Sequence, residues 1–290
     1  MSPRVAVVVV SYNTRDDLVA CLRSLAGVTL PIEIVVVDNA SHDGSAAAAR
    51  GERPDATVLE NAENEGFGRA CNRGWRASSA PLVLFLNSDA ELTAGALEAL
   101  AGVLDARPEV GIVGPRTVGA DGRIQLSTGP ALTPLAEWRQ RRLVRGLAEG
   151  RPDVLAEVEA LASREHEPVW VSGACLLARR AVLEAVRGFD ELFFLYEEDV
   201  DLCVRARAAG WRVAFSPAAT VRHGLGRSMA RSAGRAALEY HRSHLLYYRK
   251  HNGALAAFSL RLWLAVRGTV LLALARPLGP ALLKLAFRGQ

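Results

Sequence analysis

Short apolar runs rich in β-branched residues recur along the first part of the chain and predict buried strands. The three clearest runs cover residues 5–10, 32–37 and 82–86, and residues 56–59 form a weaker one. Each is too short for a typical helix, and its unbroken apolar character suits a strand covered on both faces of a sheet. We therefore expect three buried strands and one weaker strand in this part of the chain.

Between these runs, apolar residues recur at helical spacing. Leu18, Leu22 and Leu25 fall on one helical stripe, and further helices are expected after residue 64 and over residues 94–104. Strands that alternate with helices in this way are typical of a parallel sheet joined by right-handed crossovers. The pattern predicts an α/β fold with a mostly parallel, Rossmann-like sheet and helices on both faces.

The second half of the chain is less regular. The expected elements are strands at 111–114, 169–177 and 212–215, a hairpin turn at 119–122, and a helix from the acidic run at 197–201 to Ala209. Residues 127–168 are rich in Arg, Glu, Ala and Pro and carry no recognisable motif. We interpret them as loop and surface helix.

The stretch 254–287 is strongly apolar but interrupted. Its charged residues are Arg261, Arg267, Arg276 and Lys284, and its helix breakers are Gly268, Pro277 and Pro280. The longest charge-free run, 268–275, falls short of the roughly 20 residues that a spanning helix needs. We expect short helices lying in the membrane interface, with the arginines reaching headgroups. The alternative is that these helices pack on the rest of the chain or on a second subunit of a homo-oligomer.

The net positive charge of the chain comes from the same end. Residues 222–290 hold twelve Lys and Arg and one acidic residue, Glu239, a net charge of +11, whereas residues 1–221 hold 23 basic and 30 acidic residues, a net charge of −7. Such segregation indicates an anionic partner, either a membrane surface or a polyanion. A nucleic acid is disfavoured because the basic residues sit among long aliphatic runs.

Composition narrows the class of protein. Half of the residues are hydrophobic and 23% are charged, which excludes a disordered protein. The four cysteines are scattered without a CxxC pair, which argues against zinc and against a disulfide framework and fits a reducing cytoplasm. The apolar run at 5–10 is too short for the core of a signal peptide. We expect a cytoplasmic protein, held at the inner face of the cell membrane by its C-terminal part.

Polar clusters follow the predicted strands. They are Ser11-Tyr12-Asn13, Asp38-Asn39, Asn64 to Asn72, and Asn87-Ser88-Asp89. One such cluster would be turn chemistry, but the carboxyl ends of parallel strands share an edge, where open α/β sheets bind ligands. Asp38 could accept hydrogen bonds from a nucleobase or ribose. Asn72 could donate to a base carbonyl or could simply lie on a helix surface.

The usual phosphate-binding loops are missing from the sequence. No glycine follows the first strand, which argues against a dinucleotide pyrophosphate at that turn, and no GxxxxGK[ST] motif occurs. A divalent cation held by Asp89 would handle phosphate instead, because hard cations bridge carboxylates to diphosphates. His223, in Val-Arg-His-Gly, is a second candidate ligand, although a lone histidine is more often structural.

The acidic run at 197–201 holds the candidate catalytic base. Carboxylates at a helix N-terminus are favoured by the helix dipole alone. The aromatic residues at 193–196, however, make the surroundings partly apolar, where the pKa of a carboxyl rises and makes it a better base. Asp201 has Arg205 as a natural partner four residues on. Asp199 is therefore the freer candidate.

Together these motifs resemble glycosyltransferase family 2, the inverting enzymes of GT-A fold, and in particular its rhamnosyltransferase-like branch. The matching segments are VVVVSYNTRDDLVACLRSL, IVVVDNASHDGS, NEGFGRACNRG, LVLFLNSDAEL, and GFDELFFLYEEDVDLCVRARAAGW followed by VRHGLGRS. They cover residues 5 to about 230 in the family's order. The segment after residue 230 lies outside the resemblance.

The resemblance implies a GT-A domain over residues 1–230, with a nucleotide-sugar-binding half at 1–115 and an acceptor and catalytic half at 116–230, followed by a helical tail at 231–290. The donor-binding residues implied are Ser11, Asn13, Asp38, Asn64, Asn72 and Asn87. Asp89 and His223 would hold Mg²⁺ or Mn²⁺, and Asp199 would deprotonate the acceptor. Asn87 stands where the family's metal-binding DxD begins, so the expected metal site has one carboxylate fewer.

The implied reaction is a single inverting displacement that moves a sugar from a nucleoside diphosphate sugar to a hydroxyl of a lipid-linked or cell-surface glycan, in cell-wall or polysaccharide biosynthesis. The rhamnosyltransferase branch favours dTDP-rhamnose as the donor. A UDP-hexose donor is the alternative within the fold. A catalytically silent sugar-nucleotide-binding or scaffold protein is the alternative from another class.

Overall fold

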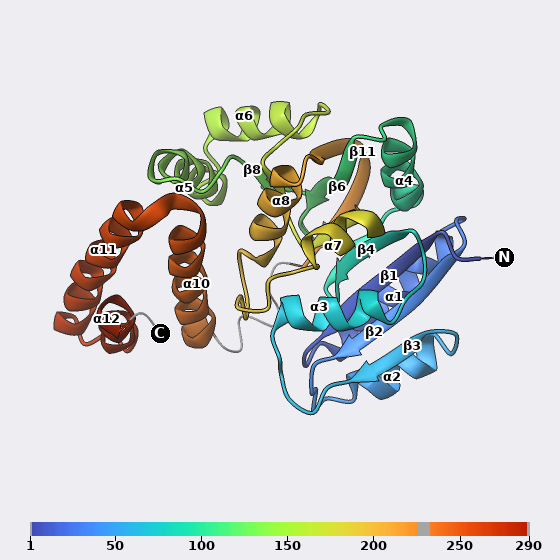
Figure 1. Cartoon of the computed structure of the whole chain (residues 1–290), viewed down its shortest axis with the longest axis horizontal. Coiled ribbons are helices and arrows are strands. Elements are labelled where there is room, and N and C mark those ends of the chain that lie inside the picture. Colours follow the sequence, from blue (N-terminus) through green and yellow to red (C-terminus); the bar gives the residue numbers. More distant parts are fainter. Residues whose placement is uncertain (1, 225–232, 289–290) are drawn as a thin grey trace.

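A nine-stranded mixed sheet forms the centre of the protein in a computed structural model, which describes residues 2–224 and 233–288 (Figure 1). The strand order is β3-β2-β1-β4-β10-β6-β11-β5, and β7 pairs with β6. The strands are β1 (Val5–Ser11), β2 (Ile32–Asp38), β3 (Thr57–Glu60), β4 (Leu82–Asn87), β5 (Ala90–Leu92), β6 (Val110–Val118), β7 (Ile124–Gln125), β10 (Cys175–Arg179) and β11 (Arg212–His223).

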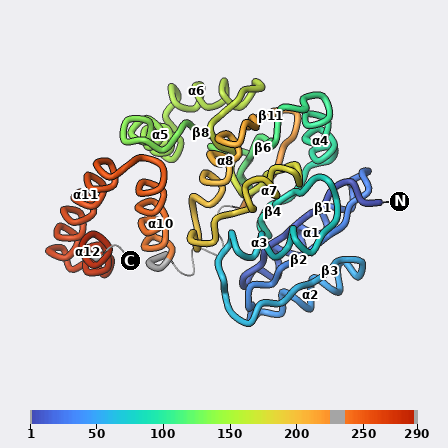
Figure 2. Tube along the Cα trace, viewed as in Figure 1, coloured from blue at the N-terminus to red at the C-terminus, as the bar shows by residue number. Residues whose placement is uncertain are grey.

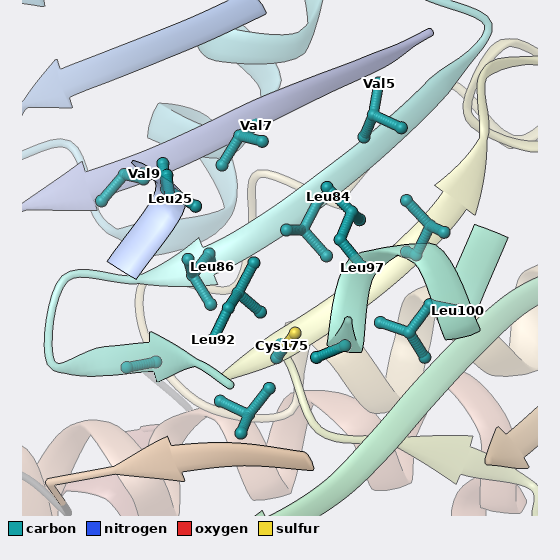
Figure 3. Close-up of a cluster of buried hydrophobic side chains, with 14 of the residues drawn as sticks. Val5, Val7, Val9, Leu25, Leu84, Leu86, Leu92, Leu97, Leu100 and Cys175 are labelled. Atoms are coloured by element: carbon teal, nitrogen blue, oxygen red, sulfur yellow. The ribbon is translucent and has the colours of Figure 1, made fainter. Parts of the chain in front are cut away.

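Helices cover both faces of the sheet, as predicted. They are α1 (Arg15–Ser24), α2 (Ser45–Glu52), α3 (Phe67–Arg76), α4 (Ala96–Ala106), α7 (Arg180–Val186) and α8 (Glu198–Ala208), with a 3₁₀ turn at Leu25–Gly27. Because side chains alternate along a strand, β1 sends Val5, Val7 and Val9 to the core under α1, α2 and α4 (Figure 3), and Val8 to the core under α3, α7 and α8. Burial on both faces explains the unbroken apolar runs.

The four strands predicted from those runs pair in parallel, with Val5 opposite both Ile32 and Leu82. The other half of the sheet differs, because β10 runs antiparallel between β4 and β6. The predicted strand at 169–177 is in fact two strands, β9 (Trp170–Val171) and β10, separated by a turn, and β9 pairs with β8 (Thr128–Gly129). The sheet is therefore mostly, but not wholly, parallel.

Two further strands are longer than predicted. The strand expected at 111–114 is β6 (Val110–Val118), and the predicted hairpin turn at 119–122 joins it to β7. The strand expected at 212–215 continues to His223 through an irregularity between Ser216 and Thr220. Pro217 lies in that irregularity and cannot donate a ladder hydrogen bond, which explains the break in register. The continuation carries His223 to the end of the sheet.

Residues 127–168 contain two surface helices, α5 (Pro134–Ala148) and α6 (Pro152–Ala162), each with proline in its first turn. They pack on each other through Leu143, Val154 and Val158. The prediction of loop and surface helix for residues 127–168 is thus confirmed.

The C-terminal segment forms three helices, α10 (Ala233–Tyr247), α11 (Gly253–Ala273) and α12 (Leu278–Arg288), with a π-helical turn at Tyr248–Asn252. Figures 1 and 2 show them at one end of the molecule, beside α5 and α8 and far from β3. Leu245, Leu264 and Leu282 of the three helices share one core with Phe193 and Val200 of the preceding part. The segment therefore packs on the rest of the chain.

The prediction of short C-terminal helices is wrong for α11, which has 21 residues. Gly268 does not break it; a Cβ there would lie 2.9 Å from Leu283 Cγ, so the glycine allows α12 to pack closely. Within the described residues, one continuous helical stretch, Ala236–Ala273, has the length and apolar composition to cross a membrane. The end of the VRHGLGRS motif and the predicted boundary at 230 lie outside the described residues.

Candidate active site

A cavity of about 450 Å³ opens where β1 and β4 end and α8 begins. Its walls include Tyr12, Asn39, Asn64, Phe67, Asn87, Asp89, Gly173, Phe194, Glu197, Glu198, Asp199, His223 and Glu239. Five of the predicted site residues, Asn64, Asn87, Asp89, Asp199 and His223, are therefore brought together from segments far apart in the sequence. The cavity lies at the carboxyl edge of the parallel strands, where the sequence predicted it.

Ser11 and Asn13 do not line the cavity but hold the segments that form its wall. Ser11 is fully buried and its hydroxyl bonds to Thr14 Oγ1 at 2.9 Å, which in turn donates to Ser88 Oγ at 2.9 Å. Asn13 accepts a hydrogen bond from the backbone N–H of His42 through Oδ1 at 2.8 Å. These contacts tie the ends of β1, β2 and β4 together.

Asp38 is buried at the end of β2, beside the cavity wall. Its Oδ2 accepts a hydrogen bond from the backbone N–H of Ser41 at 2.9 Å, while its Oδ1 has no hydrogen-bond partner among the described residues. Its neighbour Asn39 donates to Asn64 Oδ1 at 2.8 Å. A buried carboxylate oxygen without a partner is costly for folding and is the kind of group that a ligand can satisfy.

Asn72 is not part of the cavity. It is fully buried, and its amide donates to Phe189 O at 2.9 Å and to Glu191 Oε1 at 3.0 Å. Its Oδ1 accepts from the N–H of Phe189 at 2.9 Å and from Trp75 Nε1 at 3.1 Å. Asn72 therefore anchors the turn before α8 to α3. Its position fits neither the predicted contact to a base nor the helix-surface alternative.

Asp89 and His223 face each other across the antiparallel pair of β5 and β11, in which His223 is opposite Ala90. His223 Nε2 lies 3.3 Å from Asp89 Oδ1 and 3.4 Å from Asn87 Nδ2. His223 Nδ1 lies 3.2 Å from Gln125 Oε1. A proton on Nδ1 would be accepted by Gln125 and would leave Nε2 available to a cation held beside the Asp89 carboxylate.

The donor set at this position is one carboxylate and one imidazole. Among the described residues, no group of three or more His, Cys, Asp and Glu side chains is placed to hold a metal ion. An oxygen and an imidazole nitrogen are both suitable ligands for a divalent cation, and a bound diphosphate could supply further oxygens. The residues present therefore fit a metal that is completed by its ligand.

Asp199 lies in the first turn of α8 and projects into the cavity wall. Its Oδ2 accepts a hydrogen bond from the N–H of Gly173 at 2.6 Å, and its Oδ1 accepts one from the N–H of Val200 at 2.8 Å. Burial raises the pKa of Asp199 above 3.8, and the hydrogen bonds from Gly173 and Val200 oppose that shift. The environment thus makes Asp199 a stronger base than an exposed aspartate.

Asp201 is engaged elsewhere, as the sequence suggested. It is fully buried, and its Oδ2 accepts a hydrogen bond from Arg205 Nε at 2.6 Å. Its Oδ1 pairs with Lys250 Nζ at 2.7 Å and with His251 Nε2 at 2.8 Å. Asp201 therefore serves to hold α8 against the C-terminal segment.

Sequence reasoning missed three carboxylates in the cavity wall: Glu197, Glu198 and Glu239. Burial and the charge of Asp199 raise the pKa of Glu198 well above 4.5. Glu197 and Glu198 lie within the acidic run, so that run was the signal. Glu239 belongs to α10, beyond the motifs, and the sequence marked it only as the one acidic residue of residues 222–290.

Solved structures identify the fold. A mannosyltransferase from Pyrobaculum calidifontis, solved in complex with GDP-Man and Mn²⁺, matches all of this chain and 89% of its own, with a TM-score of 0.62 and 18% identity. Staphylococcus aureus TarS with UDP-GlcNAc matches 84% of this chain and 66% of its own, with a TM-score of 0.57 and 18% identity. The fold is that of the GT-A glycosyltransferases.

The sequence defines the family. Residues 3–240 match the family described as glycosyltransferase like family 2, and the chain belongs to that family of glycosyltransferases. An N-acetylglucosaminyl-diphospho-decaprenol L-rhamnosyltransferase from Mycobacterium tuberculosis is 30% identical over 267 residues, which cover 87% of each chain. A pre-mycofactocin glycosyltransferase from the same organism is 31% identical over 225 residues, 76% of this chain and 42% of its own.

Proposed function

We propose that the protein is an inverting rhamnosyltransferase that moves rhamnose from dTDP-rhamnose to a hydroxyl of a lipid-linked glycan in cell-envelope biosynthesis. One observation carries the proposal: Asp199 lies in the wall of the same cavity as Asp89 and His223, at the strand ends of a GT-A sheet. The similarity to the rhamnosyltransferase, which spans nearly the whole of both chains, supports the choice of sugar and of acceptor class.

The donor would bind along the strand ends of the N-terminal half, residues 1–115. Asn64 and Asn87 line the cavity, and Asp38, whose Oδ1 has no partner among the described residues, directly precedes Asn39 of the cavity wall, so these groups are suited to hydrogen bonding with base, ribose or sugar. Ser11 and Asn13 would act indirectly, by holding the loops. Asn72 has no part in this proposal because all of its hydrogen bonds stay within the protein.

Asp89 and His223 would hold the divalent cation, Mg²⁺ or Mn²⁺, with Asn87 beside them. The likeness to a fold neighbour solved with Mn²⁺ supports a divalent metal in general. When bound, the cation would neutralise charge on the departing diphosphate. Gln125 would keep the His223 ring oriented through Nδ1, as a partner of a metal-binding histidine does.

Asp199 would supply the base from the second half, residues 116–230. Its carboxylate would take the proton of the acceptor hydroxyl as that oxygen forms a bond to the anomeric carbon of the donor. The bond between the anomeric carbon and the diphosphate oxygen breaks, and the nucleoside diphosphate leaves with the bonding electrons. A single displacement of this kind inverts the anomeric configuration.

The outer face of α11 supports an association of the tail, residues 231–290, with a membrane. Leu255, Phe258, Leu262 and Val266 follow one helical stripe and are exposed by 83, 64, 58 and 58%. Arg261 and Arg267 belong to the same helix on either side of this stripe, and their long side chains would extend to reach headgroups. Helix α10 packs on α5 and α8, and α11 would lie on the cytoplasmic surface of the membrane without separating α10 from them. A protein held at that surface would be close to a lipid-linked acceptor.

The test is a transfer assay with purified protein. dTDP-rhamnose, UDP-GlcNAc and GDP-Man are each offered with Mg²⁺ or Mn²⁺ and an N-acetylglucosaminyl diphosphate lipid, and products are identified by mass spectrometry. We expect a deoxyhexose to be added from dTDP-rhamnose only. Transfer from UDP-GlcNAc alone would favour the UDP-hexose alternative, and donor binding without turnover would favour a silent binding protein.

A further inference from the structure

The loop that leads into α8, directly before Asp199, is held in an energetically unfavourable backbone conformation. Tyr196 and Glu197, which immediately precede α8, have φ values of 71° and 64°, and both lie in the left-handed region that side chains other than glycine disfavour. Two such residues in succession persist only when surrounding contacts enforce them. The position of Asp199, two residues further on, depends on those contacts.

Helix α10 of the C-terminal segment supplies these contacts. Ser243 Oγ donates a hydrogen bond to Leu195 O at 2.7 Å, and His244 Nδ1 lies 2.5 Å from Glu197 Oε1. The same helix contributes Glu239 to the cavity wall. Helix α10 therefore holds the loop directly before Asp199 through hydrogen bonds. It also forms part of the wall of the cavity that Asp199 lines.

His244 is fixed from its other side by α5. Its Nε2 lies 3.2 Å from Glu137 Oε2, and Glu137 Oε1 accepts a hydrogen bond from Tyr248 at 2.5 Å. The side chains of His244, Glu197 and Glu137 are only 2, 7 and 9% exposed. Both ring nitrogens thus face carboxylates out of water: Nδ1 makes a hydrogen bond with Glu197, and Nε2 lies within ion-pair distance of Glu137 without a hydrogen bond. Two carboxylates at these positions favour an imidazolium and restrict its orientation.

We propose that His244 is a positioning residue for Asp199: by clamping Glu197 between α10 and α5, it sets where the base projects into the cavity. This inference rests on the proposed function. It makes the segment after residue 230 part of the catalytic apparatus, in addition to any role at a membrane. His244 itself need not touch donor or acceptor.

The test compares His244→Asn with His241→Asn on the same helix. Asparagine retains one donor toward Glu197 but no charge, and His241 is also buried, packing near Trp263 with a ring-centroid distance of 5.9 Å. For His244→Asn we expect kcat to fall roughly tenfold to a hundredfold with the dissociation constant of dTDP-rhamnose within about twofold of wild type, because a shifted base slows chemistry without loosening the donor. His241→Asn should retain the wild-type kcat.

The pH profile gives a second readout that loss of folded protein would not produce. Burial lowers the pKa of His244, but its contacts with Glu137 and Glu197 outweigh this and raise it to about 9. Arg141 and Tyr240 also face this cluster. The wild-type kcat should therefore decline as the pH passes about 9, and this decline should be absent from His244→Asn.

The results of these experiments distinguish a failure of the positioning role from a failure of the proposed function. If wild type transfers sugar and folded His244→Asn has the wild-type kcat and the same pH profile, the positioning role is wrong. If His244→Asn does not fold, Glu137→Gln removes the charge that holds the His244 ring from α5, and a wild-type kcat in that variant overturns the role equally. If wild type transfers no sugar from any donor, the proposed function fails and the inference falls with it.

Discussion

The carboxylate of Asp199 accepts a hydrogen bond at 2.6 Å from the backbone N–H of Gly173, in the turn between β9 and β10. A Cβ at Gly173 would lie 3.2 Å from Asp199 Cβ and 3.4 Å from its Oδ2. The turn therefore both orients the candidate base and leaves no spare room beside it.

Gly173→Ala should slow turnover without unfolding the protein. The added methyl group would push Asp199 by a few tenths of an ångström, and we expect kcat to fall by about tenfold, since catalysis depends steeply on the position of the base. Gly27→Ala is the matched control, because a Cβ there meets nothing within 4 Å. Steady-state kinetics and thermal melting of both variants check this, and equal kcat values would show that the turn does not constrain the base.

Asp89→Ala should weaken metal-dependent donor binding by at least about tenfold, because the site then retains only His223. The control is Glu91→Ala, which removes an exposed carboxylate two residues further along the chain, on β5. Calorimetric titration with dTDP-rhamnose, with and without Mn²⁺, measures the effect. The metal assignment would be wrong if wild type bound the donor equally well in both conditions.

The stability of the His244 cluster should depend on pH in the alkaline range. The pKa of His244 is raised from 6.5 to about 9 in the folded protein, so its contribution is fully present below pH 6.5 and is lost as the pH rises through 9. A shift of this size corresponds to ~3 kcal/mol. Urea unfolding at about pH 6 and about pH 9.5 measures the free energy of unfolding of wild type and of His244→Asn. The difference between the two proteins should be smaller at the higher pH. A difference that stays constant argues against an ion-paired His244.

Phe258→Glu combined with Leu262→Glu should abolish sedimentation with anionic liposomes, because both side chains lie on the exposed stripe of α11 and a buried carboxylate in the interface is costly. Leu155→Glu on α6 is the control, a partly exposed apolar residue away from the tail. Unchanged sedimentation of the double variant would assign the exposed face to another partner. Light scattering would then show whether a second copy of the chain covers it.

Much of the parallel half of the fold could be predicted, because strands buried on both faces leave unbroken apolar runs and their polar ends must share an edge. That logic placed Asn64, Asn87 and Asp89 in one cavity, whereas Asp199 was found through the acidic run and the family resemblance. It failed for Asn72, whose partners Phe189 and Glu191 lie more than a hundred residues away in sequence. The pairing of His244 with Glu197 was equally invisible, since it depends on how α10 packs.

The most direct measurement of the central claim is the anomeric configuration of the product, determined by NMR for wild type and for Asp199→Asn. With dTDP-rhamnose and the N-acetylglucosaminyl diphosphate lipid, wild type should yield a rhamnoside with the configuration of the donor inverted. Asp199→Asn should bind the donor yet form at most a trace of product, because the amide cannot accept the acceptor's proton. A product with retained configuration, or normal turnover by Asp199→Asn, would contradict the account.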